Sequence, residues 1–177
     1  MRFENEITNK VAQSGIIEIN LEDFFPQNEK VLYDLKSNLY EELVLKEKDF
    51  REFVKNNNWK IYEGKSVALY CSADAIVPTW AYMLLTSALE QFAKKIVFGD
   101  LKTLENILWM ESLSKINPEN FRDARVVIKG CSDKISIPEC AYVEITRLLK
   151  PVAKSIMYGE PCSTVPVFKR KESSGDN

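Results

Sequence analysis

Residues 71–100 recur sixty positions later, without a gap, as residues 131–160. Eleven of the thirty aligned positions are identical, whereas average composition gives about two identities by chance. Each copy opens on the same Cys-Ser pair, which begins at Cys71 in the first copy and at Cys131 in the second. Self-similarity at a fixed spacing indicates two copies of one structural unit, so the fold is expected to repeat itself.

The same order of elements is predicted for both copies: a strand, a loop, a helix and a second strand. Helical spacing of apolar residues and short runs of branched residues support this order. A further run with apolar residues at helical spacing connects the two copies. The predicted strands are residues 66–70, 96–98, 125–129 and 155–158, and the predicted helices are residues 78–93, 101–113 and 138–149.

Strands that alternate with helices predict a mixed α/β fold with a mostly parallel sheet and right-handed crossovers. We therefore expect a single three-layer domain over residues 1–170, built from the duplicated strand-helix-strand unit. If the two copies share one sheet, the simplest strand order is 2-1-3-4. The segments expected within the domain are an α+β extension (1–62), the first repeat (63–100), a connecting helix (101–122) and the second repeat (123–160), with a disordered tail at 171–177.

The N-terminal third has a less regular pattern. A short helix is predicted at residues 7–12, strands at 16–19 and 31–35, and an amphipathic helix at 40–54. Near the other end, residues 165–168 are predicted to form an edge strand.

The bulk composition narrows the classes of partner. A net charge of -2 without a long basic run gives no source for nucleic-acid binding. No apolar stretch approaches the roughly 20 residues that span a bilayer, so no membrane partner is expected. The first residues are acidic and mixed, unlike a secretory signal, and this favours a cytoplasmic location.

Three cysteines follow predicted strands: Cys71, Cys131 and Cys162. Ligands of open parallel sheets bind beyond the carboxyl ends of the strands, so these thiols are expected to converge. The chain has no histidine, which excludes mixed Cys/His zinc sites and histidine-based nucleophilic catalysis. Thiolates favour soft metals, and the three cysteines predict a zinc ion or an iron-sulphur cluster.

Other residues near these strand ends could complete such a site. Asp74, Asp100, Glu160 and Cys140 are candidates for an additional ligand or base. Ser72, Gly130, Ser132 and Gly159 are candidates for contact with the cofactor. Some of these residues also have a structural explanation: Cys140 aligns with Trp80 and suits helix packing, the aligned Asp100 and Glu160 suit helix capping, and the two glycines suit tight turns.

Four segments together resemble an uncharacterised bacterial family, domain of unknown function 2480, of the type found in Bacteroidetes. They are LKEKDFREFVKNNNW (45–59), YCSADAIVPTWAYMLL (70–85), KKIVFGDLKTLE (94–105) and AKSIMYGEPCSTVPV (153–167). The resemblance covers nearly the entire chain. It implies a small cytoplasmic protein without an established activity, and it suggests iron-sulphur assembly proteins as partners.

The leading functional hypothesis is a metal or iron-sulphur protein that uses the three cysteines and acts as an accessory to cluster assembly. A thiol redox or sulphur-carrying enzyme, in which Cys71 attacks and Cys131 resolves, is one alternative. A noncatalytic interaction module is the other, and a homo-oligomer is compatible with each. The sequence does not identify a substrate.

Overall fold

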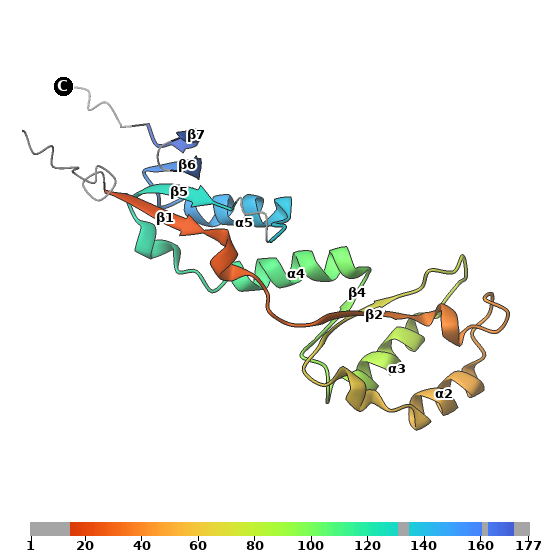
Figure 1. The fold of residues 1–177 in the computed structure, drawn as a ribbon. Coiled ribbons are helices and arrows are strands. Elements are labelled where there is room, and N and C mark those ends of the chain that lie inside the picture. Colours follow the sequence, from red (N-terminus) through yellow and green to blue (C-terminus); the bar gives the residue numbers. More distant parts are fainter. Residues whose placement is uncertain (1–14, 131–134, 161–162, 172–177) are drawn as a thin grey trace, which may run out of the picture. The chain divides into compact units, whose positions relative to one another are not determined.

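The computed structural model describes residues 15–130, 135–160 and 163–171 (Figure 1). The strands are β1 (Ile16–Asn20), β2 (Lys30–Asp34), β3 (Ser66–Tyr70), β4 (Lys95–Phe98), β5 (Arg125–Lys129), β6 (Ser155–Glu160) and β7 (Ser163–Lys169). The α-helices are α2 (Glu47–Asn56), α3 (Thr79–Leu89), α4 (Leu101–Leu113) and α5 (Glu139–Leu149). Four 3-10 turns complete the described elements: η1 (Leu21–Phe24), η2 (Leu35–Asn38), η3 (Trp59–Tyr62) and η4 (Pro118–Phe121).

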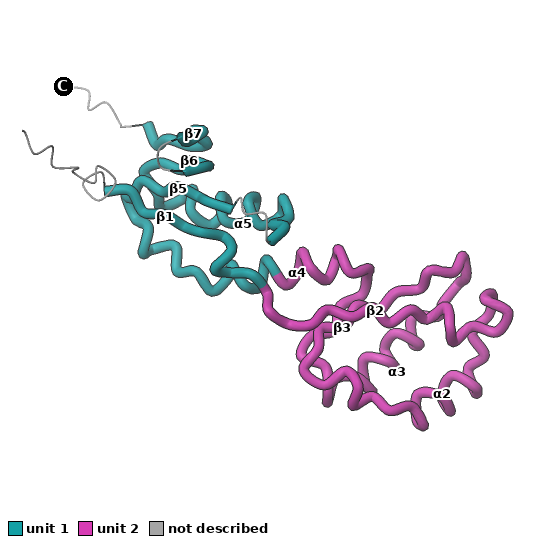
Figure 2. Tube along the Cα trace, in the orientation of Figure 1, with its two compact units in different colours: residues 1–25, 109–177 teal, residues 26–108 magenta. Residues whose placement is uncertain are grey.

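The chain divides into two compact units, each with its own sheet (Figure 2). Unit 2 comprises Pro26–Leu108 and contains the sheet β2-β3-β4. Unit 1 comprises the residues up to 25 and from 109 on, and it contains the sheet β1-β5-β6-β7. The boundary falls within α4, whose Leu104 and Leu108 pack in a core cluster of unit 2, whereas its Trp109 and Leu113 pack in the core of unit 1.

The mixed α/β class with mostly parallel pairing is confirmed, but the strand order 2-1-3-4 is wrong. That order requires β3 and β5 to be neighbours, and they belong to different sheets. Each instead pairs in parallel with a strand from the N-terminal region: β2 lies beside β3, with Tyr33 opposite Leu69, and β1 lies beside β5, with Ile19 opposite Ile128. The N-terminal strands therefore complete two sheets and do not extend one.

The duplication is larger than the sequence repeat. In each unit a strand and a 3-10 turn are followed by a helix, a second 3-10 turn and the strand-helix-strand repeat. The buried pair Phe50 and Val54 of α2 corresponds to Trp109 and Leu113 of α4, at a spacing of 59 residues. Gly130, between β5 and Cys131, is the extra residue that changes this spacing to the sixty of the later elements.

Backbone geometry repeats along with the side chains. Gly64 and Asp123 both have positive φ, at +73° and +57°, and both donate a backbone hydrogen bond across the end of the repeat helix, to Phe92 O and Val152 O respectively. The turn that leads into β3 therefore has the same form as the turn that leads into β5.

Unit 2 has three layers. Val67 and Leu69 of β3 point to one face of the sheet, where they pack with Leu85 of α3 and with α2. Ala68 points to the opposite face and packs with α4. In unit 1, Val126 and Ile128 of β5 pack with Ile145 of α5 in the corresponding way.

The longest N-terminal helix begins later than predicted. Residues 40–44 form a tight turn with one isolated bridge between Tyr40 and Val44, and α2 begins only at Glu47. Glu41 and Glu42 have positive φ (50° and 57°), a conformation that a right-handed helix cannot include. The helix predicted at residues 7–12 and all but the first residue of the tail predicted at 171–177 lie outside the described residues.

The remaining strand and helix predictions are confirmed within a few residues at their ends. Pro78 and Pro138 precede their helices as N-caps instead of forming part of the first turn. The edge strand predicted at 165–168 is β7, the end strand of its sheet. Among the helices that the structure describes, none is long and apolar enough to cross a membrane.

Truncation of the central helix of one unit is expected to weaken that unit selectively. Leu85 and Ile145 occupy equivalent positions, and both are fully buried. We expect Leu85→Ala to destabilise unit 2 by about 2 to 5 kcal/mol, because the substitution leaves a cavity between α3 and β3. Hydrogen exchange should accelerate in β3 and β4 while β5 and β6 keep their protection.

Ile145→Ala is the matched control and should produce the opposite pattern, with faster exchange in β5 and β6. Equal acceleration in both sheets after either substitution would contradict this expectation.

Candidate functional site

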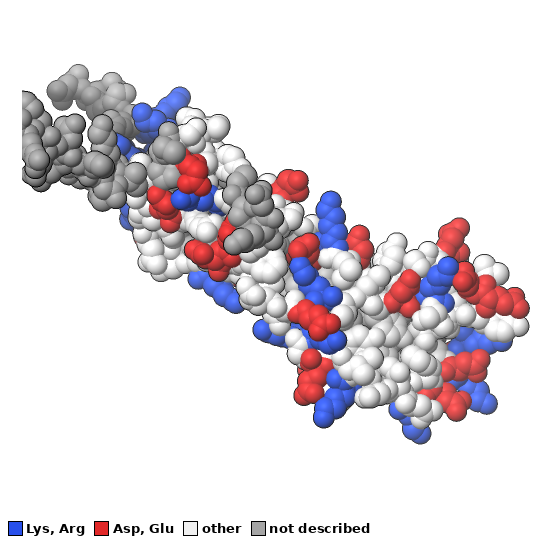
Figure 3. Space-filling view, in the orientation of Figure 1, with Lys and Arg blue, Asp and Glu red and all other residues white. Residues whose placement is uncertain are grey.

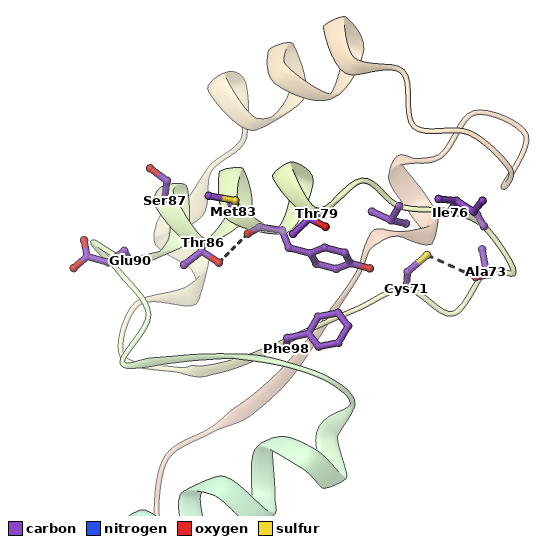
Figure 4. Close-up of a pocket in the computed structure, with 12 residues that line it drawn as sticks. Cys71, Ala73, Ile76, Thr79, Met83, Thr86, Ser87, Glu90 and Phe98 are labelled. Atoms are coloured by element: carbon purple, nitrogen blue, oxygen red, sulfur yellow. Dashed lines mark hydrogen bonds between the residues drawn. The ribbon is translucent and has the colours of Figure 1, made fainter.

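Unit 2 has a pocket of about 930 Å³ between the loop after β3, helix α3 and strand β4 (Figure 4). Cys71 and Ile76 lie at the loop end, Glu90 lies at the far end of α3, and Phe98 of β4 faces the helix. Apolar atoms make up most of the lining. Such a pocket suits an apolar group that is held in place by a few polar contacts at the margins.

Two aromatic rings form the wall on the β4 side. The Tyr82 and Phe98 rings meet edge to face, with 5.1 Å between centroids and an interplanar angle of 89°. Burial raises the pKa of Tyr82, and the neighbouring Cys71 and Asp34 raise it further. The phenol therefore stays protonated at neutral pH and can donate a hydrogen bond.

Cys71 directly follows β3 and lines this pocket. Its side chain is partly buried, packs against the core of unit 2, and donates a weak hydrogen bond from Sγ to the backbone oxygen of Ala73 at 3.9 Å. This arrangement provides one thiol at the edge of an apolar pocket. By itself it provides neither a general base nor a second thiol.

Asp34 fixes the start of the loop that carries Cys71. Its Oδ1 accepts from the backbone nitrogens of Lys36 and Ser72, each at 3.0 Å, and its Oδ2 accepts from Ser72 Oγ at 2.6 Å. One carboxylate thus caps η2 and anchors the residue after Cys71. Burial opposes ionisation, but the hydrogen bonds from Ser72 and Lys36 outweigh it and lower the pKa of Asp34.

Unit 1 has a second pocket, of about 610 Å³, at the equivalent place. Four residues line it at positions that align with the lining of the first pocket. Tyr142 and Tyr158 again meet edge to face, at 5.7 Å and 83°. The four aligned pairs are Tyr82 and Tyr142, Met83 and Val143, Thr86 and Thr146, and Phe98 and Tyr158. The remaining wall differs, because β7 contributes Val165 and Val167.

The two aligned acidic candidates have structural partners. Asp100 Oδ1 accepts from Thr103 N and Thr103 Oγ1, both at 2.7 Å, which caps the start of α4. These hydrogen bonds lower the pKa of Asp100. Glu160 forms an ion pair with Lys129 at 2.8 Å, and Lys129 also pairs with Glu18 at 3.1 Å.

The other described candidates are spread over both units. Asp74 is exposed in the loop after Cys71, and Ser72 contacts Asp34. Cys140 is on α5 and packs against the core of unit 1, as its alignment with Trp80 favours. Ser132, Cys131 and Cys162 lie outside the described residues, so the structure does not test the three-thiol site or the redox pair.

The two glycines among the candidates allow close approach in unit 1. A Cβ on Gly130 would lie 2.6 Å from the hydroxyl oxygen of Tyr142, which donates to Gly130 O at 2.7 Å. Gly159 has a φ of +118°, and a Cβ there would lie 2.6 Å from Ser163 O. These close contacts are with the protein itself, and they position α5 and β7.

No group of three or more His, Cys, Asp or Glu side chains that could hold a metal ion occurs within residues 15–130, 135–160 and 163–171. On the face drawn in Figure 3, acidic and basic side chains are interspersed over the described atoms. Ion pairs such as Lys65 with Glu29, at 2.9 Å, are typical of this surface.

Sequence reasoning missed Asp34 and the aromatic wall of the pocket. The repeat contained a signal for the wall, since residues 98 and 158 are both aromatic although they are not identical. The sequence signal for Asp34 is weaker. Asp34 precedes the 3-10 turn η2, as Asn20 precedes η1 fourteen residues earlier, and Asn20 Oδ1 likewise accepts from the backbone nitrogen of Glu22, at 3.2 Å.

Replacement of Asp34 should lower stability in a way that depends on pH. We expect Asp34→Ala to cost about 1 to 2 kcal/mol at pH 7, because the cap of η2 and the anchor of Ser72 are lost. The pKa of Asp34 is lower in the folded state than in the unfolded state, so its contribution is complete above an unfolded pKa of about 3.9. The difference between wild type and variant should shrink as the pH falls through the folded pKa.

Urea unfolding between pH 7 and pH 3 measures this difference. Asn20→Ala removes the equivalent cap in unit 1 without removing a titrating group, so its effect should not follow that titration. A constant Asp34→Ala effect across the range would refute the role of the ionised carboxylate.

Comparison of the chain with known proteins gives one match, to a protein family. The family described as "Protein of unknown function (DUF2480)" matches residues 5–170. No curated protein matches the chain. No solved structure matches it either. Since the match spans nearly the whole sequence, the chain belongs to the DUF2480 family.

Proposed function

We propose that the protein is a noncatalytic interaction module that binds a partner through the pocket of unit 2. The observation that carries the proposal is the exposure of large apolar side chains around this pocket. Ile76 is 94 % exposed, Met83 68 % and Phe98 69 %. Scattered exposed apolar residues are ordinary, but a cluster at one concave site is typical of an interaction surface.

The chemistry of the pocket favours binding over catalysis. Its rim offers one thiol, several hydroxyls and the carboxylate of Glu90. A nucleophile needs an adjacent base that is in turn oriented by a third group. Cys71 Sγ has its hydrogen bond to a backbone oxygen, and Asp34, the nearby carboxylate, is occupied by Lys36 and Ser72.

A charge in the pocket should weaken partner binding. We expect Met83→Glu to reduce recovery of a bound protein at least about fivefold, because burying an unpaired carboxylate in an apolar interface is costly. Quantitative affinity purification from the source cells, comparing variants with the wild type, measures the loss.

Val143→Glu is the matched control, since Val143 aligns with Met83 and is also 68 % exposed. Both variants should fold, as both side chains are on the surface. Cys71→Ser should retain binding, which separates this function from thiol chemistry. The proposal fails if no recovered protein distinguishes Met83→Glu from Val143→Glu.

A second candidate function is the metal or iron-sulphur site of Cys71, Cys131 and Cys162, with iron-sulphur assembly proteins as partners. It is supported by the position of three cysteines after strands of the sequence, and by Cys71, which directly follows β3 with a partly buried thiol. Thiolates would bind zinc, or iron in a cluster, and their deprotonation makes such binding dependent on pH.

Anaerobic purification with metal analysis and absorption spectroscopy tests this candidate. We expect bound metal in the wild type and a loss of most of it in Cys71→Ser, Cys131→Ser and Cys162→Ser. Cys140→Ser is the control that should retain the metal, because Cys140 packs against the core of unit 1. Metal-free wild-type protein, or full occupancy in Cys71→Ser, would exclude the site.

A further inference from the structure

The two units differ at one edge of their sheets. In unit 1, β7 pairs antiparallel with β6 and forms the end strand. In unit 2, β4 occupies the place of β6, and it is itself the end strand. Within the described part of the chain, no strand pairs with the outer edge of β4.

The cause of this difference is visible where the two strands end. In unit 1, β6 continues through Gly159, which has a φ of +118° and lies opposite Thr164, to Glu160, and the antiparallel strand β7 follows from Ser163. After β4 the equivalent Gly99 leads to Asp100, which caps α4 through Thr103. The chain therefore enters a helix at the point where unit 1 makes a hairpin.

The strand β7 shows what chemistry fits this kind of edge. Val165 lies opposite Tyr158 in the antiparallel register, and Val165 and Val167 line the pocket beside Tyr142. The side chains at i and i+2 share one face of a strand, so a branched apolar pair two residues apart meets the aromatic wall. Tyr158 is 36 % exposed next to β7, whereas the equivalent Phe98 is 69 % exposed.

The edge of β4 has few of the features that protect edge strands from pairing. Natural edges are blunted by charges, proline or bulges. After Lys95 at its start, β4 continues with Ile96, Val97 and Phe98, none of which is charged. The edge, the aromatic wall and the pocket are thus adjacent parts of one surface.

We propose that the pocket of unit 2 receives an extended segment of a partner protein, which adds to β4 as an antiparallel strand in the manner of β7 on β6. This deepens the proposed function and rests on it. The segment has branched apolar residues at alternate positions, one of them opposite Phe98. Backbone hydrogen bonds to β4 provide the pairing, and the contacts with Phe98 and Met83 select the side chains.

A peptide with the sequence of β7, STVPVFK, is the probe. It should bind the full-length protein, slow the hydrogen exchange of β4 amides and shift their NMR signals, with little change in β1 or β5. Met83→Glu should weaken this binding at least about tenfold, since it places a charge against the valine side chains. Val143→Glu should leave the binding unchanged.

Two N-methylated peptides test whether the backbone pairs. Pro166 has no N–H and lies opposite Met157, so this position of β7 is one whose nitrogen faces away from β6. Backbone direction alternates along an antiparallel strand, so the N–H of Val165 faces the partner strand and that of Thr164 faces outward. N-methylation at the Val165 position should therefore weaken binding at least about tenfold, and at the Thr164 position it should have little effect.

The failures of the two proposals are distinguishable. If the β4 amides are not protected, or if both N-methylated peptides bind equally, strand addition is overturned, while a partner that depends on Met83 would still support the interaction module. A dimer in light scattering that Met83→Glu dissociates would identify the occupant as a second copy of this chain, and would overturn the assignment to a partner protein.

Discussion

The packing of one helix against one parallel strand pair is the interaction on which each unit depends. Parallel strands need a crossover, and α3 and α5 provide it on the same face of their sheets. Ala81, Leu85 and Leu89 in unit 2 correspond to Ala141, Ile145 and Leu149 in unit 1, and all six are fully buried. The spacing at i, i+4 and i+8 gives one apolar stripe per helix, and two of the eleven identities between the copies, Ala81 with Ala141 and Leu89 with Leu149, belong to this stripe.

The two copies differ in structure outside the positions that are buried in both cores. Inside the repeat, a change at a buried position leaves a cavity or a clash, so the apolar pattern is retained. At the end of β4 and β6 the same Gly-acid pair leads to a helix in one case and to a hairpin in the other. Among the described residues, the clearest difference is the edge of β4 beside the Cys71 pocket, with which no described strand pairs.

Much of the fold could be predicted from the sequence, because helical and strand periodicity are local signals. The repeat strands 66–70 and 125–129 and the connecting helix 101–113 have the predicted bounds. The pairing of strands is not a local signal. Nothing in the spacing of apolar residues indicates that β3 pairs with β2 and that β5 pairs with β1, because periodicity along a strand does not identify its neighbour. The true extent of the duplication was hidden for a related reason: Phe50 and Trp109 fill the same place in two cores without being identical.

The candidate site was predicted less well, because its prediction required β3 and β5 to be neighbours in a single sheet. Cys71 and Cys131 align, and on one sheet with β3 beside β5 they would have flanked the same switch point. With β3 and β5 in separate sheets, that reason for bringing them together no longer applies. In the sequence, Cys71 and Cys131 follow the corresponding strands β3 and β5, which belong to different sheets. What the described residues add is the surroundings of Cys71. They are an anchored loop, an aromatic wall and an uncovered strand edge, and these are properties of a binding surface.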